Sequence, residues 1–147
     1  MNQRTVEILD TTLRDGVQAA GVIFSLEDKI KLVRALDKLG VSYIEAGNPF
    51  SNPKDAELFR FARDKLRLKN SRLAAFGMTR RSGVRAEDDA GLRAMLACGA
   101  HIASIVGKAS ISQVRDVLGV SAEENLAMIE DTARFLTSHG MSVFFDA

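Results

Sequence analysis

The feature that most constrains the fold is a repeated unit in which a helical segment, a glycine and an apolar run follow one another. After a first apolar run that starts at Ile8, further runs occupy residues 41–47, 71–77, 100–107 and 141–147. Three of these runs directly follow a helix-period segment that closes with glycine, at Gly40, Gly99 and Gly140. Glycine just past a helix is typical of a left-handed cap. Alternating strands and helices predict βα units around a parallel sheet. Nearly continuous apolar runs are typical of strands covered on both faces.

The starts of the helices carry cap signals as well. Asn52 stands before Pro53, and proline is favoured at the first helical position. Two serines precede an acidic residue by three positions, Ser25 before Asp28 and Ser121 before Glu124. No Pro/Gly/Ser-rich linker or low-complexity tract interrupts the series, so residues 1–147 are interpreted as part of one domain.

Composition excludes several classes of function. The net charge is +1, with no Trp and one Tyr, which argues against a nucleic-acid partner. The N-terminus lacks the apolar region of a signal peptide, and no run approaches the ~18 apolar residues of a membrane span. A cytoplasmic protein without a membrane partner is expected. The single cysteine, Cys98, excludes an internal disulfide and a cysteine-based zinc site.

Two parallel-sheet architectures remain. An open nucleotide-binding sheet is disfavoured, because the first turn lacks G-x-G-x-x-G and "GKAS" (107–110) lacks the first glycine and the Ser/Thr of a P-loop. In a (β/α)8 barrel, chemistry gathers at the carboxyl ends of the strands. Polar residues stand at the expected strand ends: Asp10, Arg14, Asp15, Glu45 and Asp146.

A closed barrel needs about 250 residues, and this chain offers five strands. The favoured interpretation is therefore a partial TIM barrel of about five parallel βα units, with an open five-stranded sheet as the alternative. Unpaired strand edges favour self-association, for example as a homodimer.

Several motifs resemble one enzyme family. "LDTTLRDGVQ" (9–18), "LGVSYIEAGNP" (39–49), "SNPKDAE" (51–57), "AFGMTRRSGV" (75–84) and "EENLAMIEDTARFL" (123–136) are similar to the acetyl-CoA-dependent condensing enzymes of the DRE-TIM metallolyase superfamily. These include isopropylmalate, homocitrate and citramalate synthases, and the stretches "SNPKDAE" and "FGMTRR" look most like the citramalate-synthase branch. The resemblance covers essentially the whole chain.

The resemblance implies a Claisen-type condensation of acetyl-CoA with a 2-oxo acid, pyruvate being favoured, with release of CoA. It identifies Arg14 as the catalytic arginine, suited to stabilising oxyanion charge. It identifies Asp15 as a ligand of a divalent metal, Mg²⁺ or Mn²⁺. From spacing alone, a structural ion pair explains these two residues equally well.

Five further residues are weaker candidates. Gln18, Glu45, Ser104 and Arg80 are possible substrate contacts, and Asp10 is expected to orient a neighbouring ligand rather than bind the metal. Each of these residues also has a purely structural interpretation. Gln18 would stabilise its loop, Glu45 would hydrogen-bond to neighbouring backbone, Ser104 would be a hydrogen-bonded serine in the core, and Arg80 would be a solvated charge in a loop.

Some family features are missing or altered. The His-x-His metal ligands of the family have no counterpart here and are expected beyond Ala147, so the 147-residue piece by itself should be inactive. "GKASISQV" (107–114) and "AGNPF" (46–50) depart from the citramalate pattern near the expected substrate. Isopropylmalate or homocitrate synthesis, retro-aldol cleavage by a lyase and a non-catalytic half-barrel that binds or associates remain alternatives.

Overall fold

The computed structural model describes residues 6–147 and forms one sheet of five parallel strands in chain order. The strands are β1 (Leu9–Asp10), β2 (Tyr43–Gly47), β3 (Arg72–Met78), β4 (Ile102–Val106) and β5 (Ser142–Asp146). The α-helices are α1 (Leu26–Leu39), α2 (Pro53–Lys65), α3 (Ala90–Ala97), α4 (Ile111–Gln113) and α5 (Ala122–Ser138). Short 3-10 turns lie at Gly16–Gln18 and Ala86–Asp88, and a π-helical turn follows α4 at Val114–Leu118.

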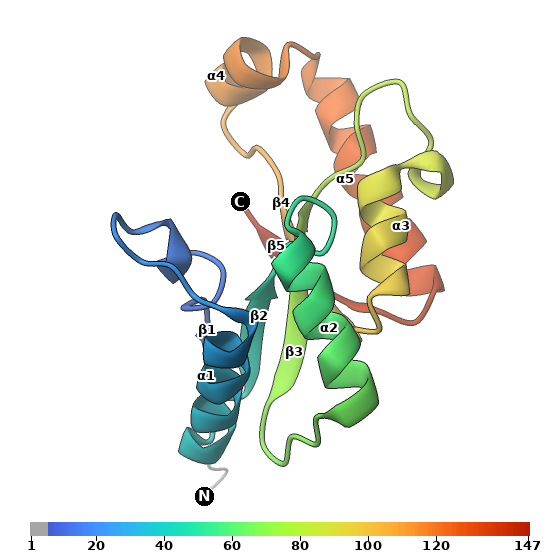
Figure 1. The fold of residues 1–147 in the computed structure, drawn as a ribbon. Helices are drawn as coiled ribbons and strands as arrows, with labels where there is room; N and C mark the ends of the chain where they lie inside the picture. The colour runs from blue at the N-terminus through green and yellow to red at the C-terminus, as the bar shows by residue number, and fades with distance from the viewer. Residues whose placement is uncertain (1–5) are drawn as a thin grey trace, which may run out of the picture.

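The sheet curls strongly, and its long helices cover the convex side (Figure 1). Tyr43 on β2 and Phe144 on β5 meet edge to face, with ring centroids 4.9 Å apart, although two strands separate theirs in the sheet. Only a curled sheet brings side chains of such distant strands into contact on its concave face. The five parallel strands therefore form a half-barrel, which confirms the predicted partial barrel.

Alternation along the strands divides the side chains between the two faces. Ile44, Ala75, Ala103 and Ile105 are buried in the layer between sheet and helices, together with Val33, Leu58, Phe59, Leu92 and Leu136 from the helices. On the other face Phe76, Ser104 and Phe144 are aligned in register across β3, β4 and β5. The candidate residue Ser104 therefore lies on the face opposite the main apolar core.

The cap signals of the sequence have structural counterparts. Ser25 and Asp28 form a reciprocal capping box at the start of α1, and Gly40 ends that helix at a φ of 87°. Asn52 accepts a hydrogen bond from the Lys54 N–H at the start of α2. Each cap satisfies a backbone group that the helix leaves unpaired.

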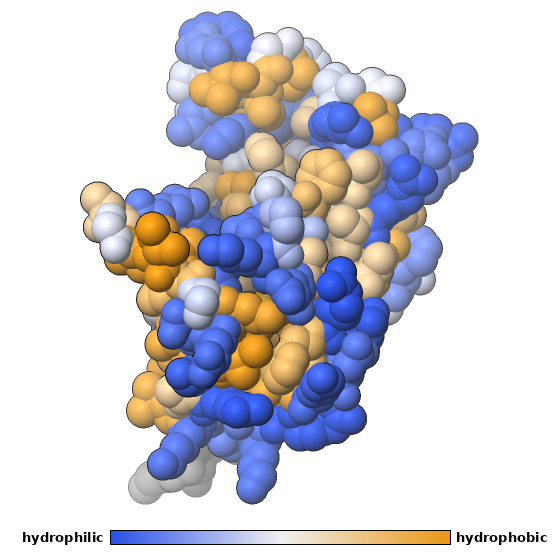
Figure 2. All heavy atoms as spheres, in the orientation of Figure 1, coloured by the Kyte–Doolittle hydropathy of each residue, from blue (hydrophilic) through white to orange (hydrophobic). Residues whose placement is uncertain are grey.

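The segment between β4 and α5 was not predicted as helical. There α4 and the π-helical turn run from Ile111 to Leu118, ending at Gly119 in the left-handed region. Exposed apolar side chains, including Ile111 and Val117, lie over this segment (Figure 2). Of the helices within residues 6–147, none combines the length and hydropathy that crossing a bilayer requires.

Candidate active site

Arg14 lies in the tight turn that follows β1. The N–H groups of Arg14, Asp15 and Gly16 all approach the carbonyl of Thr11, at 3.1, 2.8 and 3.3 Å. Leu13 is completely buried in the core and anchors this turn. With Leu13 directed into the core, the next side chain, Arg14, is directed toward the concave face.

The guanidinium of Arg14 has three partners on that face. Its Nε donates to Glu45 Oε2 at 2.5 Å, and Nη1 donates to Asp15 Oδ1 at 3.2 Å. Its Cζ lies 4.2 Å from the centroid of the Phe76 ring, within the range of a cation–π contact. Glu45 is 1% exposed, so its charge depends on the arginine for compensation. These contacts fix the direction of the guanidinium without enclosing it.

A cavity of about 310 Å³ opens beside Arg14, where the concave face meets the carboxyl ends of β1, β4 and β5. Its lining includes Arg14, Glu45, Ser104 and Asp146. Leu9 of β1 and Phe145 of β5 line it as well, because the curl of the sheet brings its two edge strands toward one another. The structure therefore brings together three of the candidate residues named from the sequence, namely Arg14, Glu45 and Ser104.

The other candidates lie around this cavity or away from it. The Asp15 side chain is 61% exposed and contacts Arg14 alone among the described ion pairs. Asp10 accepts hydrogen bonds from the N–H and hydroxyl of Thr12, both at 3.0 Å, and thereby caps the turn. Gln18 is exposed in the 3-10 turn after Asp15. Neither Asp10 nor Gln18 lines the cavity.

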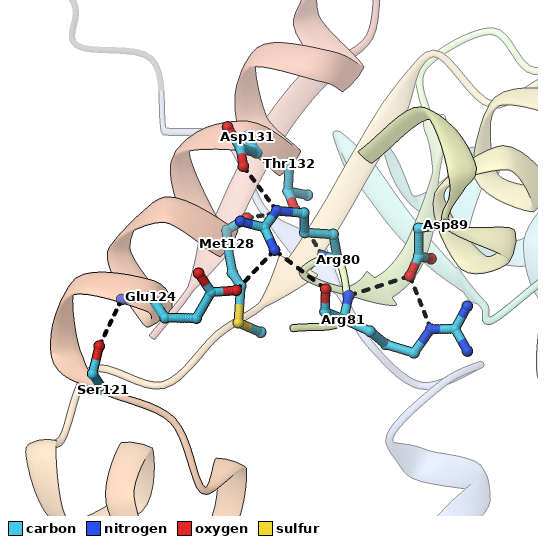
Figure 3. A network of polar contacts seen from close by, with 8 residues as sticks. All are labelled: Arg80, Arg81, Asp89, Ser121, Glu124, Met128, Asp131 and Thr132. Carbon is cyan, nitrogen blue, oxygen red and sulfur yellow. Dashed lines mark hydrogen bonds and ion pairs between the residues drawn. The ribbon is translucent and has the colours of Figure 1, made fainter. Parts of the chain in front are cut away.

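Arg80 belongs to a separate polar network between the loop after β3 and helix α5 (Figure 3). It donates from Nε to Asp131 at 2.8 Å and from Nη1 to Glu124 at 3.0 Å, while its own N–H donates to Thr132. Burial opposes the charge of Arg80, yet these two carboxylates outweigh it and raise the pKa of the guanidinium. Its contacts connect the loop after β3 to helix α5. Contact of Arg80 with a substrate remains a prediction.

The same network explains an incomplete cap. Ser121 accepts the Glu124 N–H as expected at the start of α5, but the Glu124 side chain turns to Arg80 instead of returning to the cap. The hydrogen bond from Arg80 lowers the pKa of Glu124. Next to it, Arg81 donates to Asp89, the N-cap of α3 (Figure 3).

A buried ion pair behind the site was missed. Lys29 of α1 and Asp55 of α2 are 3% and 5% exposed and pair with one another. The sequence contained a signal that both side chains would be buried. Lys29 stands three residues after Leu26 and four before Val33, and Asp55 precedes Leu58 and Phe59 by three and four, so both share the apolar face of their helix.

Asp15 is the candidate metal ligand that the sequence suggested. Within residues 6–147, no group of three or more His, Cys, Asp or Glu side chains is arranged to hold an ion. Asp15 fits a hard divalent cation, because it is an accessible carboxylate whose only ion-pair partner here is Arg14. Asp15 is thus a candidate ligand, and residues 6–147 show no complete ligand set around it.

Comparison with known proteins places this geometry in a family. The HMGL-like family model matches residues 5–147. The chain belongs to the HMGL-like family, within the DRE-TIM superfamily.

Among the family's members, (R)-citramalate synthases are similar along the whole chain. The enzyme of Sulfolobus acidocaldarius is 46% identical over 100% of this chain and 28% of its own length. That of Streptomyces coelicolor is 42% identical over 95% of this chain and 26% of its own length. Homocitrate synthase AksA of Methanosarcina mazei is 32% identical over 97% of this chain and 33% of its own length. The chain therefore spans about a third or less of these curated relatives.

Solved structures agree on the fold. Hydroxymethylglutaryl-CoA lyase from Pseudomonas aeruginosa superposes with a TM-score of 0.71 at 23% identity, over 95% of this chain and 45% of that chain. The HMG-CoA lyase of Bacillus subtilis superposes with a TM-score of 0.70 at 24% identity, over 95% of this chain and 45% of that chain. At these identities the likeness concerns the fold alone.

Proposed function

We propose that the protein condenses acetyl-CoA with a 2-oxo acid, with pyruvate as acceptor and citramalate as product. The acetyl methyl group loses a proton to a base, and its carbon forms a bond to the keto carbon, whose oxygen takes up a proton and becomes a hydroxyl. Water then cleaves the thioester, which leaves a carboxylate and releases CoA. The observation that carries this proposal is the Arg14 guanidinium held by buried Glu45 at the edge of a cavity, with Asp15 beside it.

Each residue has a role that follows from its chemistry. Arg14 is permanently charged, and its N–H groups suit the negative charge that develops on the keto oxygen. Glu45 holds that guanidinium in direction, so little reorganisation is needed when charge develops. The Ser104 hydroxyl, at the same cavity, is suited to a hydrogen bond with the acceptor.

Asp15 would hold a divalent cation, Mg²⁺ or Mn²⁺. When bound, such a cation orients a 2-oxo acid and polarises its keto group. Arg14 lies next to Asp15, so one side chain would bind the ion while its neighbour would stabilise the oxygen that gains charge.

The test uses the full-length gene product. Release of the CoA thiol is followed with a thiol reagent, in the presence of Mn²⁺, for pyruvate, 2-oxoisovalerate and 2-oxoglutarate, and the product is identified by mass spectrometry. Pyruvate-dependent release with formation of citramalate is expected. Preference for one of the larger acceptors would reassign the protein to isopropylmalate or homocitrate synthesis. Cleavage of a 2-hydroxy acid without condensation would indicate a lyase.

Asp15→Asn tests the site itself. Because Asp15 is exposed, the variant should keep its melting temperature while losing turnover by at least 100-fold. Asp116→Asn, at another exposed acid, is the matched control and should keep full activity. Undiminished turnover in Asp15→Asn would refute the site. Absence of both Mn²⁺ binding and CoA release in the unmodified protein would favour a non-catalytic half-barrel.

A further inference from the structure

The buried pair Lys29–Asp55 lies directly behind the turn that carries Arg14. Lys29 Nζ pairs with Asp55 Oδ1 and also lies 3.4 Å from the carbonyl oxygen of Leu13, the residue before Arg14. Both side chains come from the helices α1 and α2, which lie side by side in Figure 1 and contact one another. The ammonium therefore connects the core of the protein to the backbone of the active-site turn.

The carboxylate of Asp55 makes the opposite connection, to the end of β2. Its Oδ2 accepts the N–H of Asn48 at 2.9 Å. Gly47, at a φ of 126°, leaves room for this approach, because a Cβ there would overlap the Asp55 carboxylate. Glu45, the partner of Arg14, stands two residues earlier on the same strand.

These contacts form a closed circuit. It runs from Arg14 through Leu13 to Lys29 and Asp55, then through the end of β2 to Glu45 and back to Arg14. Two segments far apart in the sequence, the turn after β1 and the end of β2, are thus fixed relative to one another from behind. The backbone segments that carry Arg14 and Glu45 are thus attached to the same ion pair.

The physical cost of such a pair argues for a role beyond stability. Desolvating two charges costs about as much as their attraction returns, and apolar residues of similar volume often stabilise a core equally well. A lysine of this kind, satisfied by a carboxylate and one backbone carbonyl, gives directional contacts that apolar packing does not give. We infer that Lys29 and Asp55 are positioning residues that hold the Arg14 guanidinium against Glu45, and hence in the direction that the proposed function requires.

The test replaces the pair by apolar residues, Lys29→Met with Asp55→Leu, in the full-length gene product. The readout is independent of activity, namely the rate at which phenylglyoxal, an arginine-specific reagent, modifies Arg14, followed by peptide mass spectrometry. Modification at exposed Arg72 serves as the internal reference. With Arg14 released from Glu45, its modification should become at least fivefold faster, while the melting temperature changes little.

Two further variants bracket this result. Glu45→Gln gives the rate for an Arg14 without its charged partner, and the double variant should approach that rate. Leu136→Ala, a cavity in the fully buried part of α5, gives the effect of destabilisation alone and should leave Arg14 reactivity unchanged. If the double variant does not fold, Asp55→Asn keeps the volume of the side chain and its acceptor for Asn48, and should accelerate modification in the same direction.

Steady-state kinetics of the same double variant test whether the pair also matters for turnover. If the protein is a condensing enzyme, kcat should fall at least tenfold in the double variant while KM for the 2-oxo acid changes less than threefold. Unchanged Arg14 reactivity in a folded double variant would overturn the inference. Faster modification of Arg14 in a protein that condenses no 2-oxo acid would leave the positioning pair intact and reject the proposed function instead.

Discussion

Arg14 and Glu45 are 31 residues apart in sequence, yet Nε and Oε2 approach to 2.5 Å on the concave face of the half-barrel. The carboxylate is almost wholly buried, whereas the guanidinium remains partly accessible at the cavity. This asymmetry suits a site in which the buried Glu45 carboxylate fixes the direction of the Arg14 guanidinium and leaves it free to contact a ligand. An arginine meant only to satisfy a buried acid would gain nothing from an open side toward a cavity.

Glu45→Gln should therefore weaken function more than folding. A neutral amide accepts a weaker hydrogen bond than a carboxylate. The charged hydrogen bond contributes about 1.5–3 kcal/mol, so its weakening corresponds to at most a roughly 10- to 100-fold loss in kcat if it is expressed in the transition state. Steady-state kinetics of the full-length gene product with acetyl-CoA and pyruvate measure it. A variant with unchanged kcat would show that the pair serves packing alone.

Gly47→Ala should be costly for two separable reasons. The φ of 126° strains any other residue, and the added Cβ would overlap the Asp55 carboxylate. Gly140, at a φ of 83° with no atom within 4 Å of its Cβ position, has the strain without the overlap. Urea denaturation should give a loss of about 1 kcal/mol for Gly140→Ala and about 3 kcal/mol or more for Gly47→Ala. Equal losses would mean that Asp55 moves aside freely.

The fold was predictable from sequence because its signals are local and repeated. Helix-closing glycines such as Gly40, serine caps such as Ser25 and apolar runs of strand length all act within a few residues. The clustering of Arg14 and Glu45 followed from one further rule, that parallel strands carry their functional residues at the same edge. Neither inference required knowledge of long-range contacts.

What escaped prediction depends on partners far away in the chain. Asp55 in the first turn of a helix resembles a residue that complements the helix dipole, and only the folded chain shows Lys29 beside it. In the sequence, Glu124 occupies the position of a capping-box acid, but in the structure its carboxylate accepts a hydrogen bond from Arg80 instead. Short helical turns such as Ile111–Leu118 carry too little periodicity to be recognised.

Asp37 should make stability depend on pH in the acid range. Burial alone would raise its pKa, but the N–H groups of Asn70, Ser71 and Lys69 bind the carboxylate and lower the pKa below 3.8. A group whose folded-state pKa is depressed contributes stability above its unfolded value, and this contribution is lost as pH falls through the folded value.

Asp37→Asn should accordingly cost about 1–3 kcal/mol near pH 7, where the charged acceptor is present. The difference from the unmodified protein should shrink below about pH 4 and approach a constant once the carboxylate is protonated. Urea denaturation at a series of pH values measures both, with Asp116→Asn as an exposed control. A difference that stays constant down to pH 2 would contradict the hydrogen-bond account.

The edges of the half-barrel should make the 147-residue chain associate with itself. Within residues 6–147, β1 pairs with β2 alone and β5 with β4 alone, so each edge strand has one side without a partner strand in this part of the chain. Ile8 and Phe145, beside or within those strands, are 58% and 45% exposed. Free strand edges with apolar side chains are templates for pairing with another chain.

Sedimentation of residues 1–147 at micromolar concentration should therefore show dimers or larger species. Phe145→Lys, which adds charge to an edge strand, should shift the distribution toward monomer. Phe50→Lys is the matched control, because Phe50 is 58% exposed in the turn after β2, a strand paired on both of its sides, and its replacement should leave association unchanged. Equal effects of the two substitutions would assign the association to general surface hydrophobicity rather than to the strand edges.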